Sequence, residues 1–180
     1  MKRIAFILIL IATCPVKAFC LPVRVYFSPE PVYVNTGENF TIDLMADIPQ
    51  PVLGWGLDIQ HGPELDYLGI FTYGSSWTPL SSRDSDGLAG LAPLNLVSGT
   101  EILLATLNFK WLGGNTSAEI FPQYTKGDLA EGFWLENFAF AEVELQSTTI
   151  NPVPEPSTLL LLGIGIGSFA GMRKKILNRK

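Results

Sequence analysis

Two uncharged apolar runs, one near each terminus, limit the part of this chain that can fold into a globular domain. The first run covers residues 4–12 and the second covers residues 157–172. Runs of this kind are typical of segments that enter or cross a lipid bilayer. The 180-residue chain therefore has room for one domain with a sizeable core, and that domain must lie between the two runs.

The N-terminal segment has the three parts of a secretory signal peptide. Lys2 and Arg3 precede the apolar run, and small residues at plausible cleavage spacings follow it, either Val16 and Ala18 or Ala18 and Cys20. A retained membrane anchor is the alternative, but the apolar run is too short to cross about 30 Å of hydrocarbon as a helix. We therefore interpret residues 1–20 as a signal peptide.

The cysteines agree with export. The chain has 2 cysteines, Cys14 and Cys20, and both lie within or at the edge of the leader. We expect the exported domain to have no disulfide, no thiolate metal site and no cysteine nucleophile. Burial of a hydrophobic core must then supply its stability.

The C-terminal run is long enough to suggest a membrane span. A helix over residues 157–172 would cover about 24 Å, and the basic side chains that follow can extend to the headgroups. Five of the last eight residues are Lys or Arg, which favours a cytoplasmic location for the tail at 173–180 and an external location for the domain. Pro154 and Pro156 end any helix on the outer side.

The C-terminal segment at residues 152–180 resembles a known sorting signal. The sequence VPEPST at 153–158, followed by a Leu- and Gly-rich run and a basic cluster, resembles the PEP-CTERM signal of Gram-negative bacteria that make exopolysaccharide. The resemblance implies cleavage near Pro-Glu-Pro by an exosortase, a membrane cysteine protease. It implies export through the inner membrane to the cell envelope, cell surface or extracellular matrix, with the helix holding the chain in the membrane before processing. The implied recognition residues are Pro154, Glu155, Pro156, Arg173, Lys174 and Lys175.

The charge of the middle segment excludes one class of partner. Three of the 12 basic residues lie in the leader and five in the tail, so four remain against all 17 acidic residues, a net charge of −13. A domain this acidic, without a basic patch, is repelled by phosphate, so we predict no binding of nucleic acid. The charge favours solubility outside the cell and is compatible with divalent cations.

The middle segment shows the two-residue period of half-buried strands. Phe40, Ile42, Leu44 and Ala46 alternate with polar or partly polar neighbours. Similar segments at 23–27, 32–34, 52–59, 102–111 and 138–145 are separated by Pro, Gly, Asn and Asp. No window has a sustained helical period, although residues 84–96 are ambiguous. We predict an all-β domain over residues 21–151, an antiparallel β-sandwich.

The start of this segment is similar to the start of cohesin-like domains. The similarity covers VRV at 23–25, PVYVNTGENFTIDL at 31–44 and VLGWGLDI at 52–59. It implies a nine-stranded jelly-roll sandwich, a fold shared with some carbohydrate-binding modules. Cohesin-like domains usually continue into a Tyr-Asp-Pro-like turn, whereas this chain keeps Pro63 and Leu65 and lacks the Asp. The change leaves the expected fold intact but puts dockerin binding in doubt.

Residues able to carry catalysis are sparse. His61 is the only histidine, and no spacing couples it to a serine hydroxyl of the 75–76 or 81–82 pairs. No spacing selects a pair among the 17 carboxylates for glycoside hydrolysis. We predict that the domain is not an enzyme.

Two further features could bind ligands. Asp84 and Asp86, followed by Gly87, resemble the start of a calcium loop, but Ala89 and Asn95 stand where an EF-hand needs Gly and Glu. We therefore favour an acidic surface turn over a Ca²⁺ site, and predict no cofactor. Among the aromatic residues, Trp55 and Trp111 fall at alternating strand positions and should be core.

Trp77 and Trp134 lie in loop-like sequence and are the predicted contacts for carbohydrate. Three functions remain open at this point. In order of preference, they are a surface-sorted adhesive or matrix protein, a carbohydrate-binding module for extracellular polysaccharide, and a secreted hydrolase.

Overall fold

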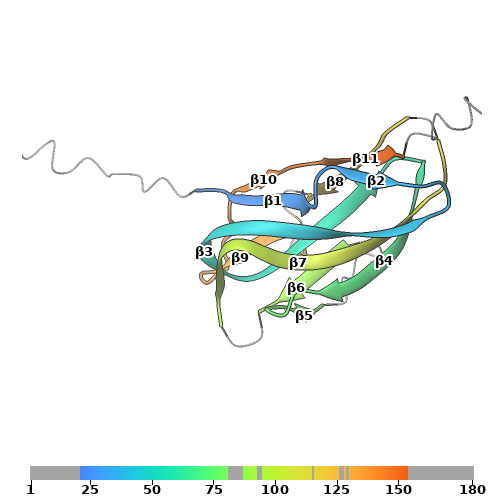
Figure 1. Ribbon diagram of the computed structural model, residues 1–180. Helices are drawn as coiled ribbons and strands as arrows, with labels where there is room; N and C mark the ends of the chain where they lie inside the picture. Colours follow the sequence, from blue (N-terminus) through green and yellow to red (C-terminus); the bar gives the residue numbers. More distant parts are fainter. Residues whose placement is uncertain are drawn as a thin grey trace, which may run out of the picture.

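The described part of the chain is an all-β domain (Figure 1). The computed structural model describes residues 21–80, 87–92, 95–114, 116–125, 128 and 130–153, and contains no helix within them. The predicted signal peptide, membrane helix and basic tail, and the weak calcium candidates Asp84 and Asp86, lie outside these residues. The strands are β1 (Val23–Ser28), β2 (Val32–Val34), β3 (Asn39–His61), β4 (Leu65–Tyr73), β5 (Thr78–Pro79), β6 (Gly87–Leu91), β7 (Val97–Trp111), β8 (Ala118–Gln123), β9 (Gly132–Leu135), β10 (Val143–Leu145) and β11 (Thr148–Pro152).

The 23-residue strand β3 belongs to both layers of the sandwich. Its first part pairs with β1 and β7, and its second part pairs with β6, β8 and β9. Figure 1 shows β3 running along one layer and returning through the other at a steep angle. The direction changes where the ladder with β7 shifts register between Ile48 and Val52. Pro49 and Pro51 lie in this interval, and proline cannot donate a ladder hydrogen bond.

The pairings define two layers. The first has the order β10-β1-β3-β7-β4, and the second has the order β5-β6-β3-β8-β11-β2. Strand β9 pairs only with β3, next to the residues of β3 that pair with β8. The prediction of a fully antiparallel sandwich is wrong at two places, because β1–β10 and β2–β11 are parallel pairs. The cause is the interruption at Pro29-Glu30-Pro31, which divides the first strand so that β1 joins one layer and β2 the other.

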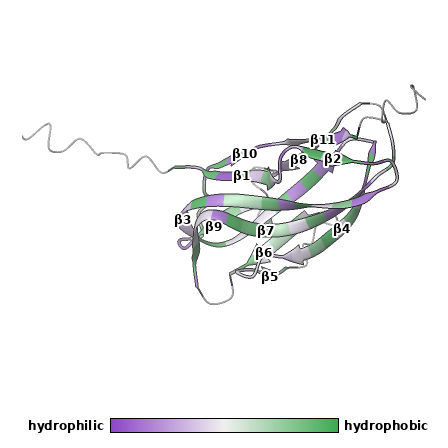
Figure 2. Cartoon of the chain, viewed as in Figure 1, coloured by the Kyte–Doolittle hydropathy of each residue, from purple (hydrophilic) through white to green (hydrophobic). Residues whose placement is uncertain are grey.

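The core forms between the layers, as the alternation predicts. Along β3, Ile42, Leu44, Ala46 and Ile48 are buried, while the intervening residues are not. Figure 2 shows hydrophobic and hydrophilic residues interleaved along the strands. Trp55 and Trp111 are fully buried, which confirms that they are core residues. The expectation that Phe138 and Phe140 belong to a closing strand is wrong, because the chain turns there and Phe138 is 81% exposed.

In the sequence Gly54-Trp55-Gly56-Leu57 the indole and leucine side chains point into the core, and the two glycines lie on the opposite face of β3, where they too are buried. A Cβ at Gly56 would clash with the carbonyl oxygen of Ala130, and a Cβ at Gly54 would lie 2.8 Å from the Trp134 ring. The segment at 130–134 therefore covers the outer face of β3 closely, and only glycine permits that approach.

Replacement of a core leucine tests this description. Leu44→Ala removes a fully buried side chain from the first part of β3, so we expect the free energy of unfolding to fall by about 3 kcal/mol. Thr41→Ala, on an exposed position of the same strand, should change it by no more than about 0.5 kcal/mol. Urea unfolding followed by tryptophan fluorescence measures both values, and equal effects would contradict the layer assignment.

Candidate functional site

The described chain ends within a strand ladder, directly before the predicted sorting residues. In β11, Asn151 and Pro152 are in register with Tyr33 and Val34 of β2. The Val153 amide then donates a hydrogen bond to the Val34 carbonyl oxygen at 2.9 Å. The fold thus holds the chain up to the residue before Pro154. The predicted recognition residues Pro154, Glu155, Pro156, Arg173, Lys174 and Lys175 lie outside the described residues.

Several loops meet where β11 ends. The Gly37 amide donates to the Trp111 carbonyl oxygen at 2.9 Å, and the Leu112 amide donates to the Glu64 carbonyl oxygen at 2.8 Å. Three large apolar side chains in this region are exposed, Tyr33 at 60%, Leu112 at 53% and Val153 at 40%. We call the region formed by 33–38, Leu112 and Val153 the exit end.

The exit end also carries a fixed negative charge. The Glu38 carboxylate accepts hydrogen bonds from the Asn35 amide at 2.9 Å and from Asn35 Nδ2 at 2.8 Å. These two bonds stabilise the ionised form and lower the pKa of Glu38 below its usual value. The exit end is therefore apolar in part and acidic in part at neutral pH.

The structure does not support Trp77 as a carbohydrate contact. Its side chain is only 6% exposed, and the indole Nε1 donates to the Leu103 carbonyl oxygen at 3.0 Å. Its ring packs edge-on against Trp55, with 6.3 Å between centroids. The backbone does form a turn, because the Trp77 amide bonds to the Gly74 carbonyl oxygen, but the side chain points into the core and offers no face to a sugar.

Trp134 is placed differently. It lies on β9, pairs with Gly54, and is half-buried over that glycine. Phe140 forms an isolated bridge with it and is 43% exposed. Sequence reasoning missed Phe140 and Phe138 as companions of Trp134, although Asn137, which lies between Trp134 and Phe138 in the sequence, is a typical turn residue.

A cavity of about 360 Å³ adjoins this hairpin and has an aromatic and acidic lining. Glu131 is nearly fully buried there, and its carboxylate accepts a hydrogen bond from the Thr125 amide. Aromatic faces beside a few fixed polar groups are typical of ligand pockets. The lining residues are Tyr124, Thr125, Glu131, Gly132, Phe140, Ala141 and Glu142.

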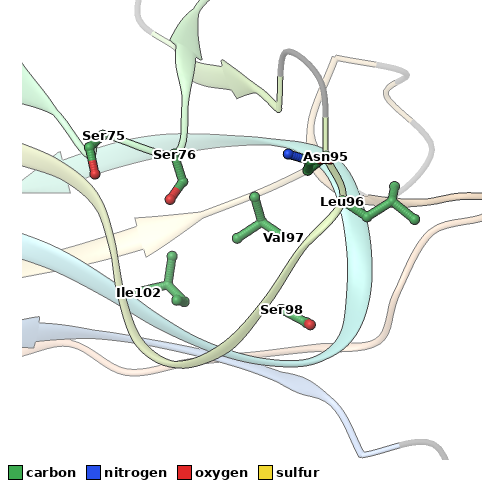
Figure 3. Close-up of a pocket in the computed structure, with 7 residues that line it drawn as sticks. All are labelled: Ser75, Ser76, Asn95, Leu96, Val97, Ser98 and Ile102. Atoms are coloured by element: carbon green, nitrogen blue, oxygen red, sulfur yellow. The ribbon is translucent and has the colours of Figure 1, made fainter.

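A second pocket, of about 450 Å³, has hydroxyl groups in its lining but no acid or base (Figure 3). Figure 3 shows Ser75 and Ser76 facing Val97 and Ile102 across the pocket. Hydroxyls can hydrogen-bond a ligand here, but the described lining provides no group for proton transfer. The lining residues are Ser75, Ser76, Asn95, Leu96, Val97, Ser98 and Ile102.

His61 belongs to an aromatic cluster at the end of β3. Its ring lies 5.9 Å from Phe109 and 6.5 Å from Tyr67, centroid to centroid. Burial, with a smaller contribution from Tyr73, raises the pKa of the Tyr67 hydroxyl to about 12. Within the described ranges, no three His, Cys, Asp or Glu side chains gather to hold a metal ion, and no helix is long and apolar enough to cross a membrane.

Comparison with protein families identifies the C-terminal segment. Residues 152–175 match the model described as PEP-CTERM protein-sorting motif. The segment is a PEP-CTERM sorting motif. It begins at Pro152, the last residue of β11. The motif implies an exported protein associated with the cell envelope of a Gram-negative bacterium and processed by an exosortase.

Comparison with solved structures shows a cohesin-like fold. The cohesin module of a Clostridium perfringens family 33 glycoside hydrolase aligns with a TM-score of 0.58 and 12% identity, over 74% of this chain and 100% of that chain. A non-cellulosomal cohesin from the archaeon Archaeoglobus fulgidus aligns with a TM-score of 0.57 and 11% identity, over 77% of this chain and 96% of that chain. A Clostridium thermocellum cohesin–dockerin complex aligns with a TM-score of 0.54 and 8% identity, over 74% and 100%. A search of curated proteins finds no significant match.

The raised pKa of Tyr67 predicts a pH dependence of stability. In the unfolded chain a tyrosine ionises near pH 10, whereas the folded chain keeps the Tyr67 proton up to about pH 12. The contribution of the protonated Tyr67 hydroxyl to folding stability is therefore fully present below pH 10 and should be lost as the pH rises to 12. Tyr67→Phe should flatten this decrease in urea unfolding midpoints between pH 9 and 11. Tyr33→Phe, at an exposed position, should leave this decrease unchanged. Equal slopes of the unfolding midpoint against pH in the two variants would contradict the assignment of the decrease to the buried Tyr67 hydroxyl.

Proposed function

We propose that this chain is an exported envelope protein that an exosortase processes and whose cohesin-like domain acts, without catalysis, in adhesion or in contact with the extracellular matrix. The observation that carries the proposal is the sorting motif at 152–175, which starts at the last residue of the folded domain. A motif in this position delivers the complete sandwich to the outer side of the membrane and leaves no other domain between fold and signal.

The charge distribution supports the same orientation. The basic tail at 173–180 favours the cytoplasmic side, and the segment of net charge −13 between leader and tail favours an aqueous exterior. Two of the described pockets support a binding role rather than a catalytic one. The pocket in Figure 3 lacks a titratable group, and the buried Glu131 carboxylate already accepts a backbone hydrogen bond.

Replacement of the Pro-Glu-Pro residues tests the processing step. In a host that contains an exosortase, the wild-type chain should lose its basic tail, because the protease recognises this segment. The triple variant Pro154→Ala, Glu155→Ala and Pro156→Ala should keep it. Intact-mass spectrometry of the exported chain distinguishes the two forms. Ser157→Ala with Thr158→Ala is the matched control and should be cut normally. A wild-type chain that keeps residues 173–180 at steady state would refute the proposal.

A second candidate, binding of extracellular polysaccharide, is favoured by the hairpin of β9. Trp134 is half-buried and Phe140 and Phe138 are exposed beside it, so an aromatic surface faces solvent next to the cavity at Tyr124. Sugar rings can pack on such faces, and the Glu131 and Glu142 carboxylates in the cavity lining are acceptors for their hydroxyls.

A titration with the polysaccharide of the producing strain tests this candidate. Trp134→Ala should weaken binding by roughly tenfold, because an aromatic anchor is lost, and intrinsic tryptophan fluorescence or calorimetry measures the change. Leu80→Ala is the control, since Leu80 is exposed at 39% outside this hairpin. Wild-type protein that gives no signal with the polysaccharide would exclude the binding site.

A further inference from the structure

The exit end contains Val153, the residue directly before Pro154 of the sorting motif. We propose that, before processing, the exit end rests directly on the surface of the lipid bilayer. This inference builds on the proposed function and on the sequence-based expectation that residues 157–172 span the membrane before processing. It goes beyond that function by assigning one surface of the domain to one partner, the headgroup region of the bilayer.

The chain that connects the folded domain to the uncharged run is short. The Val153 amide is bonded to the Val34 carbonyl oxygen, so Val153 has a fixed place in the fold. Three residues, 154–156, separate it from the uncharged run that begins at 157. Four residue steps reach at most about 14 Å even when fully extended. The part of β3 from Asn39 to Ile48 alone is about 30 Å long, so the connection is shorter than half of the domain.

The pairing of β11 with two neighbouring strands prevents the connection from becoming longer. This strand pairs with β8 on one side and with β2 on the other. Thr148 and Ile150 are almost completely buried within it. Release of Pro152 and Val153 from β2 would add only about 7 Å, and further release would expose Ile150 to water. The domain must stay near the membrane for as long as it is folded and anchored.

The surface that the short connection brings to the membrane is partly apolar. Tyr33, Leu112 and Val153 are all exposed at the exit end. Figure 1 shows that β2 and β11 both end on this side of the sandwich, whereas β1 begins at the opposite side. Tyrosine is enriched at membrane interfaces because its ring is apolar and its hydroxyl is polar. The apolar side chains at the exit end are thus suited to the bilayer interface, beside which the short connection holds them.

Charge identifies the type of surface that fits. The ionised Glu38 carboxylate, with its lowered pKa, lies at the exit end, and the backbone of Glu64 is bonded to Leu112. These carboxylates are repelled by anionic lipids. A zwitterionic headgroup layer is therefore the surface that this end accommodates best.

Quenching by spin-labelled lipids tests the proposal. The chain is expressed in a Gram-negative host without an exosortase, with Cys20→Ser so that an introduced cysteine is the single thiol after leader removal, which intact mass verifies. A fluorophore is attached at Leu112→Cys or, as the matched control, at Glu136→Cys, an exposed position at the other end of the domain. The purified protein is reconstituted into phosphatidylcholine vesicles that carry nitroxide headgroups.

We expect quenching at position 112 to be several-fold stronger than at position 136. Insertion of twelve Gly and Ser residues between Val153 and Pro154, which adds a mean reach of about 19 Å, should reduce the signal at 112 toward that at 136. Equal quenching at both positions in the wild-type chain, while the protein floats with the vesicles, would overturn this inference alone. Protein that fails to float with the vesicles would overturn the membrane span, and with it both this inference and the proposed anchoring.

Discussion

The bend of β3 between Ile48 and Val52 is the constraint on which the rest of the domain depends. One strand supplies an interior member of each layer, so the two sheets are covalently joined between interior strands rather than between edge strands. Ile48 and Val52, at the two sides of the bend, are both fully buried. Because proline cannot continue the ladder, Pro49 and Pro51 end one set of pairings and allow the other to begin. The layer order of β1, β6, β7, β8 and β9 follows from where each meets β3.

The division of the first strand has a comparable effect on the C-terminus. Pro29-Glu30-Pro31 separates β1 from β2, and the short β2 then provides the edge on which β11 closes the second layer. The parallel pair β2–β11 brings the start of the sorting motif into the sheet, because Pro152 is both a ladder residue and the first residue of the motif. The folded domain and the sorting motif therefore share Pro152. A protease that acts near Pro154 must therefore work beside a folded sandwich.

The parts of this arrangement that the sequence predicted are those that depend on local pattern. Two-residue alternation predicted the two parts of β3, as separate strands at 40–46 and 52–59, most of β7, and the core positions of Trp55 and Trp111, because burial on one face imposes that period directly. That one strand continues through the bend was not predicted. The parallel pairs were not predicted, since they join residues more than 100 positions apart, such as Val23 with Val143. Trp77 was misjudged for a related reason. Its sequence signals a turn, which the backbone makes, but whether an indole at a turn points inward depends on Gly90 and Leu103, whose proximity is not encoded locally. The motif residues 154–156, in contrast, were recognisable from their order alone.

The exit end and the β9 hairpin lie at positions that make their proposed functions compatible. The exit end lies where β2 and β11 end, whereas Trp134 pairs with Gly54, next to the bend of β3 at the other end of the domain. The first part of β3 separates these ends by about 30 Å. A domain that rests on the bilayer through Tyr33, Leu112 and Val153 therefore points the β9 hairpin, with Trp134 and Phe140, away from the membrane. Contact with lipid and contact with an extracellular polymer do not compete for the same surface. Cleavage near Pro154 would free the first surface without altering the second, so the same hairpin can serve the anchored and the processed protein.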